Sequence, residues 1–162
     1  MTKALFFLWS VGMISCTVKN DSLTYDDLNI NGVVLQQTTN SIVEKMGNPD
    51  TISNYENEMD DETWKDYRYK DNSLYFYENN LMGFELRNEH FYFYKPEIKV
   101  GSNIDIIQPF FPNSYKNKGF VNGLGFIIID IENGKDKSSD SFVVLNYNTS
   151  TNSITSIHLG SK

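Results

Sequence analysis

Apolar and polar residues alternate with a period of two along the middle of the chain, in segments separated by short polar turns. Successive side chains of a strand point to opposite faces of a sheet, so this pattern predicts strands with one apolar face. Asn79 and Asn80 separate two of the segments, and asparagine tolerates the positive φ of tight hairpin turns. Residues 51–55 are a candidate strand, and with the strands predicted at residues 63–69, 73–78, 81–87 and 91–94 they give an antiparallel meander of about four strands.

A helical pattern precedes the meander. Ile42, Val43 and Met46 lie on one face of a helix at this spacing (i, i+1, i+4). Residues 38–41 (Thr-Thr-Asn-Ser) provide N-terminal caps, and residues 47–49 (Gly-Asn-Pro) end the helix with a left-handed position and a residue that cannot continue it. The pattern predicts a short helix that packs on a sheet.

A second unit with the same order of elements follows residues 95–97 (Lys-Pro-Glu), which interrupt the alternation. A shift of 64 residues (102 − 38) places Ser102 on Thr38 and Ile106 on Ile42, so a hydroxyl cap again stands before apolar helix positions. The strands predicted after this second helix cover residues 119–131, 141–147 and 153–159.

A helix followed by strands, twice, suggests an internal duplication with repeats at residues 30–96 and 97–162. Pro109 argues against a continuous second helix, because proline has no backbone N–H to donate. The 162 residues, 40% hydrophobic and 14% aromatic, suffice for one folded domain or two very small ones. We expect an α+β fold at residues 30–162, an antiparallel β-sheet with short helices packed on one face.

The chain begins with a short apolar segment behind a basic residue. Lys3 is followed by apolar residues over most of residues 4–14. A helix needs about 20 apolar residues to span a bilayer, whereas the apolar part of a signal peptide has about 7–15. The segment therefore predicts a signal peptide. Cys16 follows it and, as the single cysteine of the chain, has no partner for an intramolecular disulfide.

Residues 13–16 (Met-Ile-Ser-Cys) resemble the processing site of bacterial lipoproteins, with Met13 where leucine is usual. The resemblance implies removal of residues 1–15, lipid attachment to Cys16, and a flexible tether over residues 16–29. The alternatives are an ordinary secretory leader or an uncleaved hydrophobic segment, and in both Cys16 has no special role.

The chain is acidic, with a formal net charge of −7, and removal of Lys3 with the leader changes this to 13 − 21 = −8. Nucleic acids and anionic lipid headgroups both attract basic surfaces, so we expect no nucleic-acid partner and membrane attachment only through lipid on Cys16. Thr17 follows Cys16 in place of the aspartate that retains enterobacterial lipoproteins at the inner membrane. This difference favours the outer membrane as the location in the cell envelope.

A second resemblance covers residues 30–162. Its motifs, at residues 41–49, 64–69 and 74–81, give the order capped helix, Gly-Asn-Pro, aromatic strand, turn and strand. This order is similar to the α+β modules of outer-membrane assembly lipoproteins of the SmpA/OmlA (BamE) type and of the tandem β-lactamase inhibitor protein. The resemblance implies helices on one face of an antiparallel sheet, binding to another protein, and no catalytic role for the matched positions.

The residues that carry acid–base or metal chemistry are few. His90 lies in a polar turn and His158 in the last predicted strand, and no G-x-S-x-G motif accompanies them. Residues 130–136 resemble a calcium loop, but the glycine falls at position 5 rather than 6, and position 12 is not glutamate. Residues 60–62 (Asp-Asp-Glu) are typical of an exposed loop. We expect no catalytic residue, no metal site and no cofactor, and therefore not an enzyme.

Tyrosine recurs at alternating positions of the predicted strands. Such residues stabilise a sheet through cross-strand pairs, and they are also enriched at interfaces because the ring is apolar and its hydroxyl polar. The leading hypothesis is a face that binds another envelope protein, and the alternative is a face that binds a glycan or a small ligand. The candidate residues are Tyr67, Tyr69, Tyr75, Tyr77, Tyr92 and Tyr94.

Overall fold

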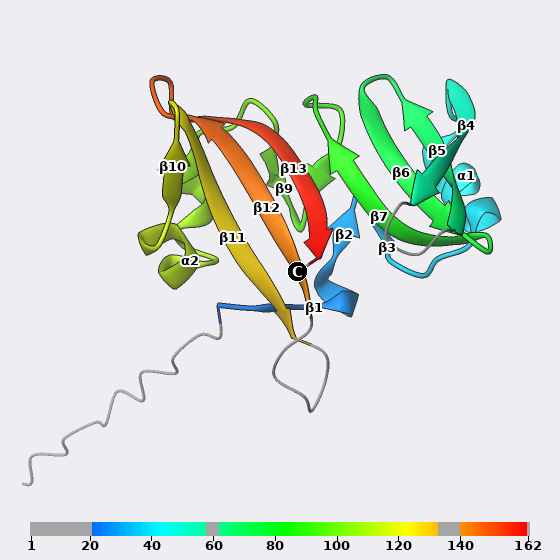
Figure 1. Cartoon of the computed structure of the whole chain (residues 1–162), viewed down its shortest axis with the longest axis horizontal. Helices are drawn as coiled ribbons and strands as arrows, with labels where there is room; N and C mark the ends of the chain where they lie inside the picture. The colour runs from blue at the N-terminus through cyan, green and yellow to red at the C-terminus, as the bar shows by residue number, and fades with distance from the viewer. Residues whose placement is uncertain (1–20, 58–61, 133–139, 162) are drawn as a thin grey trace, which may run out of the picture.

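The computed structural model describes residues 21–57, 62–132 and 140–161, which form two β-sheets and a few short helices (Figure 1). Within the described residues, the large sheet has nine strands. Their order is β1 (Leu23–Thr24), β11 (Leu124–Glu132), β12 (Ser141–Asn148), β13 (Ser153–Ser161), β7 (Asn80–Leu86), β6 (Asn72–Tyr77), β5 (Glu62–Tyr69) and β4 (Thr51–Asn57), with β10 (Gly119–Val121) paired to β11. The small sheet has the order β3 (Val33–Val34), β2 (Asn29–Ile30), β8 (Tyr92–Phe93) and β9 (Lys95–Lys99). All strand pairs are antiparallel except β1 with β11.

The predicted meander is confirmed for its first four strands, because β4, β5, β6 and β7 pair in sequence order. The turn between β6 and β7 holds Glu78 and Asn79 at φ values of 46° and 68°, in the left-handed region that the asparagine-rich turn predicted. The fifth predicted strand, at residues 91–94, does not continue the meander. It forms β8 of the small sheet, and residues 95–97, predicted to interrupt the pattern, begin β9.

The first predicted helix is confirmed as α1 (Thr39–Met46). Thr38 caps it, because its hydroxyl oxygen accepts a hydrogen bond from the backbone N–H of Ser41 at 3.5 Å. Gly47 ends it at a φ of 83°, which favours glycine, and Ile42 is fully buried on the inward face.

The second predicted helix is wrong in position, and the predicted internal duplication is not supported. A 3₁₀ helix, η2 (Ile104–Ile107), forms instead, followed by the short α2 (Pro112–Lys116). Pro109 lacks the N–H that would continue the helix, and Asn103 rather than Ser102 caps η2 by accepting from the N–H of Asp105 at 2.8 Å.

The large sheet consists of two halves that meet at a short contact between β7 and β13. Among the described residues, Leu86 with Ile157 and Glu85 with His158 are the pairs across this contact. Beyond it the two strands diverge (Figure 1). There each strand pairs with a loop through an isolated β-bridge, β7 at Asn80 with Thr38 and β13 at Ser153 with Asn103.

The hydrophobic core lies between the two sheets. One face of the large sheet buries apolar side chains from both halves, among them Leu74, Phe76, Phe84, Ile127, Ile129, Val143 and Ile157. The small sheet and the short helices lie on this side, behind the large sheet in Figure 1. Each fully buried Leu, Ile or Phe contributes about 1.5–3 kcal/mol through removal of apolar surface from water. The other side of the large sheet is called the open face, since no described element covers it in Figure 1.

The predicted tether at residues 16–29 belongs in part to the fold. Leu23 in β1 and Leu28, which follows the 3₁₀ helix η1 (Tyr25–Asp27), are buried in the core at 2% and 0% exposure. Cys16 and the predicted leader lie outside the described residues. Among the helices that the structure describes, none has the length and apolar character needed to cross a membrane.

Candidate functional site

A row of directly paired residues crosses the open face through both halves of the sheet. Each pair occupies opposing positions on neighbouring strands, so the side chains point to the same side. The row is polar on β5 to β7, reaches a histidine on β13 and becomes apolar on β12 and β11. Its members are Thr51, Arg68, Ser73, Glu85, His158, Val144 and Ile128.

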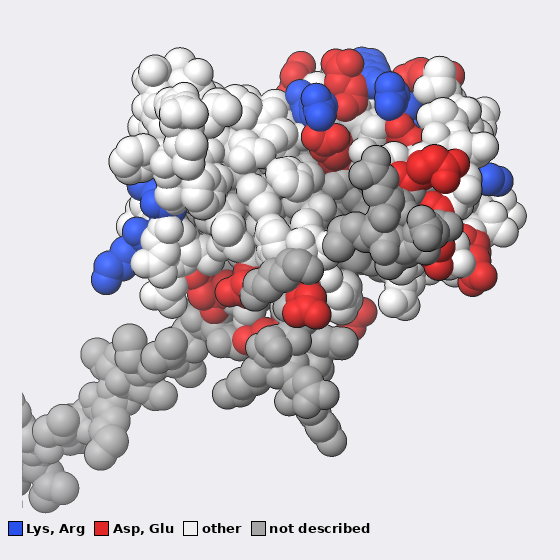
Figure 2. Space-filling model, in the orientation of Figure 1, with Lys and Arg blue, Asp and Glu red and all other residues white. Residues whose placement is uncertain are grey.

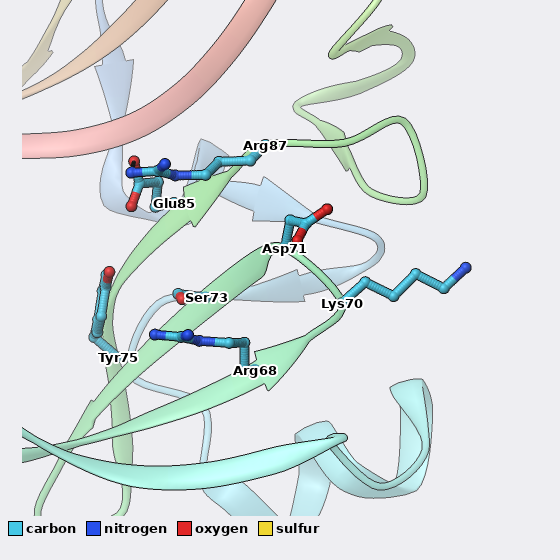
Figure 3. Close-up of a pocket in the computed structure, with 7 residues that line it drawn as sticks. All are labelled: Arg68, Lys70, Asp71, Ser73, Tyr75, Glu85 and Arg87. Atoms are coloured by element: carbon cyan, nitrogen blue, oxygen red, sulfur yellow. Dashed lines mark ion pairs between the residues drawn. The ribbon is translucent and has the colours of Figure 1, made fainter.

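The polar half of the row opens into a hollow of about 300 Å³. Ser73, at 6% exposure, lies between the side chains of Arg68 and Arg87 (Figure 3). The ring of Tyr75 forms one wall, and the Lys70 side chain points away from the others (Figure 3). The seven lining residues, which we call the arginine hollow, are Arg68, Lys70, Asp71, Ser73, Tyr75, Glu85 and Arg87.

Asp66 holds the guanidinium of Arg68 in place beside this hollow. The Nη2 and Nε atoms of Arg68 donate to Oδ2 of Asp66 at 2.8 and 3.2 Å. The Asp66 side chain is 5% exposed and that of Arg68 is 55% exposed, so the carboxylate is buried and the guanidinium faces water. Oδ1 of Asp66 is buried without a hydrogen-bond partner among the described residues.

A second ion pair stands on the opposite side of Ser73. Nη2 of Arg87 lies 2.7 Å from Oε1 of Glu85, whose side chain is 26% exposed. The hydrogen bond and the charge of Glu85 raise the pKa of Arg87 above its ordinary value. Both arginines are therefore oriented by a carboxylate at one edge of the guanidinium, while Nη1 of each has no hydrogen-bond partner among the described residues.

The hydroxyl of Tyr75 is neutral at ordinary pH. Burial raises the pKa of Tyr75. The Glu85 and Asp66 carboxylates raise it further, while a hydrogen bond with Ser73 acts in the opposite direction. The Tyr75 ring also lies 5.0 Å from that of Tyr55, which is 45% exposed on the edge strand β4. A neutral phenol and a serine hydroxyl thus stand between two oriented guanidinium groups.

His158 lies beyond the hollow, opposite Glu85. Burial lowers the pKa of His158, the charge of Glu85 acts against this shift, and that of Arg87 adds to it. The Nδ1 atom is buried without a described hydrogen-bond partner. His158 is thus a half-buried imidazole that favours the neutral form.

The other half of the open face is apolar. Val121, Leu124 and Ile128 of β10 and β11 are 60%, 57% and 43% exposed. Figure 2 shows this half mostly free of charge, whereas charged side chains gather over β5 to β7. We call these three residues the apolar patch.

The structure brings together only part of the predicted tyrosine face. Tyr75 and Tyr77 share the open face, where Tyr77 packs against Trp64 with ring centroids 6.0 Å apart. Tyr67 and Tyr69 share the opposite, inner face, and Tyr69 donates to the carbonyl of Gly47 at 3.1 Å.

Tyr92 and Tyr94 lie elsewhere, in and beside β8 of the small sheet. The ring of Tyr94 packs against Phe110 and Phe111, with centroids 6.0 and 5.4 Å away. Because strand alternation fixes only which residues share a face, the six tyrosines do not form one surface.

The remaining candidates contribute no assembled site among the described residues. His90 is exposed and contacts Nζ of Lys70. The described residues contain no group of three or more His, Cys, Asp or Glu side chains placed to hold a metal ion. The calcium-like loop at residues 130–136 and the acidic residues 60–62 lie partly outside the described residues, as Cys16 does entirely.

The arginine hollow was not predicted from the sequence. Arg68 and Arg87 are the two arginines of the chain, out of 14 basic residues, and both fall at alternating positions of predicted strands. The position of both arginines in predicted strands was a usable signal of an anion-binding site, because arginine presents several donors in a rigid fork suited to carboxylates.

No family model matches the sequence, and no curated protein matches it. Among solved structures, an extracellular protein containing a SCP domain from Bacillus anthracis str. Ames is similar, with a TM-score of 0.50 and 9% identity. The match covers 100% of this chain and 50% of that protein. A cysteine-rich secretory protein from Staphylococcus aureus subsp. aureus Mu50 gives a TM-score of 0.48 at 13% identity, covering 89% of this chain and 48% of that protein. The chain thus spans about half the length of both proteins, and the likeness concerns the fold alone.

These similarities correct the family prediction. The fold is similar to half of an extracellular protein containing a SCP domain, and the predicted resemblance to SmpA/OmlA-type or β-lactamase-inhibitor-type modules is wrong. The similarities also provide no evidence for a lipoprotein processing site at residues 13–16. The order of a short helix and aromatic strands is common to many α+β folds, which explains why it misled.

Proposed function

We propose that this chain is a non-catalytic accessory module that binds an envelope or extracellular protein through the open face of its large sheet. The apolar patch carries this proposal, because Val121, Leu124 and Ile128 stay 60%, 57% and 43% exposed on a face that no described element covers. Exposed apolar surface bordered by polar residues marks interaction sites in soluble proteins. Burial of these three side chains by a partner would remove the cost of their exposure to water.

The proposed location is outside the cytoplasm. The predicted signal peptide supports it, and so does the extracellular protein whose fold this chain resembles. Lipid attachment to Cys16 stays a prediction. Growth with an alkyne-tagged palmitate tests it: we expect label on the wild type and none on Cys16→Ala, and an unlabelled wild type would contradict the anchor.

Site-specific photocrosslinking tests the binding proposal. A photoreactive amino acid at Leu124 lies in the apolar patch, and one at the exposed Glu97 of β9 lies on the small sheet as a control. We expect a discrete crosslinked protein from position 124 in native cells, absent from position 97 and lost when Ile128→Lys is added. Equal crosslinking from both positions, or no effect of Ile128→Lys in a folded variant, would overturn the proposal.

A further inference from the structure

The arginine hollow is a second feature of the open face, independent of the apolar patch. It holds the two arginines of a chain whose net charge is −7. Asp66 and Glu85 each bind one guanidinium through a single carboxylate oxygen and leave other N–H groups of that guanidinium without a described partner. Orientation by a carboxylate reduces the entropy lost when a ligand is bound, so the arginines are prepared to receive an anion.

We propose that the arginine hollow binds the carboxylate of a uronic acid, either free or as a unit of an acidic glycan. Arg68 and Arg87 donate to the carboxylate from the two sides of Ser73, and the hydroxyls of Ser73 and Tyr75 supply further hydrogen-bonding groups (Figure 3). This site does not depend on the protein partner proposed above.

The carboxylates around the hollow favour a monoanion over a dianion. Asp66 and Glu85 each pair with one of the two guanidinium groups, Asp71 adds a further negative charge, and the Lys70 side chain points away from the hollow. A carboxylate carries one negative charge, whereas inorganic phosphate near neutral pH carries between one and two. A dianion would also be repelled more strongly by Asp71, Glu85 and the buried Asp66.

The mixture of groups favours a sugar over a peptide. Asp71 and Glu85 are acceptors for ring hydroxyls, which a sugar offers on several carbons and a peptide C-terminus lacks. The exposed ring of Tyr55, 5.0 Å from that of Tyr75, offers an apolar surface next to the hollow for the C–H face of a sugar. The donors here are side chains, whereas capture of a peptide carboxylate typically uses successive backbone N–H groups.

The test is NMR titration of the folded protein with sodium glucuronate, with glucose as the neutral sugar of the same ring. We expect glucuronate to shift the resonances of Arg68, Arg87 and Tyr75, and glucose to bind at least about tenfold more weakly, because it lacks the charged partner of the arginines. Arg87→Gln is expected to weaken glucuronate binding about tenfold. Lys99→Gln, which removes one charge from the exposed end of β9, is the matched control and leaves the affinity unchanged.

Arg68→Lys complements these variants because it keeps the charge beside buried Asp66 and removes only the planar fork. We expect this variant to fold and to bind glucuronate about tenfold more weakly. Ile128→Lys should bind glucuronate normally, which separates this site from the apolar patch. Equal binding of glucose, equal weakening by Lys99→Gln, or tighter binding of inorganic phosphate or acetyl-alanyl-alanine would overturn the proposal.

Discussion

Glu85 and His158 face each other across the contact through which β7 joins β13. This pair and its neighbour, Leu86 with Ile157, are the ladder positions that connect the two halves of the large sheet. Leu86 and Ile157 are fully buried on the inner face, whereas Glu85 and His158 lie on the open face, where Glu85 lines the arginine hollow and His158 lies between that hollow and the apolar patch. The junction therefore consists of a buried apolar pair on the inner face and a polar pair on the open face.

The first prediction concerns stability at acidic pH. Burial depresses the pKa of His158 below its ordinary value of 6.5, so the unfolded chain binds a proton more readily than the folded one. The contribution of neutral His158 to the free energy of unfolding is therefore complete above about pH 6.5, and it is lost as the pH falls through the depressed pKa of the folded state. Urea unfolding between pH 7.5 and 5 measures this slope, and His158→Gln should reduce it.

His90→Gln is the matched control, because His90 is exposed in a loop and its imidazole ring contacts Nζ of Lys70. We expect this variant to keep the wild-type slope, since it leaves His158 in place. A slope that is equally reduced in both variants would show that the buried position of His158 has no special influence.

The alternation of the sequence was sufficient to find β4 to β7, because the period of two is a local property of each strand. It did not place β8, because membership of a sheet depends on pairing with β2, about 60 residues away in the chain. In the same way, alternation put Tyr67 and Tyr69 on one face but did not show that this face is the buried one. The opposite face carries Asp66 and Arg68, and neither side of β5 is purely apolar.

Local sequence patterns do not reveal the arginine hollow. Arg68 and Arg87 become neighbours of the same serine only through the registers that pair Arg68 with Ser73 and Ser73 with Glu85. A shift of one residue in either register would move one arginine to the other face of the sheet. The sequence holds the residues of the site, and the β5–β6–β7 pairing brings them together.

The second prediction contrasts two neighbours on β11. Ile127 is fully buried, whereas Ile128 is 43% exposed on the open face. We expect Ile127→Ala to lower the free energy of unfolding by about 2–5 kcal/mol through lost burial and a cavity. Ile128→Ala should cost about 1 kcal/mol or less, as for exposed strand positions. Chemical denaturation of the two variants measures the difference, and similar losses would contradict the assignment of the two faces.

The third prediction concerns an aromatic ring that covers a glycine. A Cβ at Gly125 would lie 2.0 Å from the Tyr147 ring, its partner across the ladder, and Tyr147 is only 5% exposed. Gly125→Ala must displace that ring, and we expect a loss of about 1–3 kcal/mol, as for other overpacked sites. Gly83→Ala is the control, since its Cβ would meet Tyr75 at an ordinary 3.5 Å. Equal thermal stability of the two variants would show that Tyr147 moves aside without cost.

The fourth prediction concerns the buried carboxylate beside the hollow. Arg68→Ala leaves Asp66 at 5% side-chain exposure without its described ion-pair partner, so this variant should be less stable than the wild type. The same replacement in an Asp66→Asn background should cost less, because no buried charge remains. Arg68 is 55% exposed, and solvent screening limits the expected coupling in this double-mutant cycle to about 1 kcal/mol.

The corresponding cycle on Glu85 and Arg87 is the control for this last prediction. Both side chains of that pair reach water, at 26% and 61% exposure, and exposed pairs contribute little to stability. We therefore expect a smaller coupling energy for Glu85→Gln with Arg87→Ala, and a stronger reduction of it by added salt. Urea denaturation at low and high salt measures both cycles. Additive losses of stability at Asp66 and Arg68 would mean that the guanidinium does not stabilise the buried carboxylate. Asp66 would then not fix the position of Arg68 in the hollow.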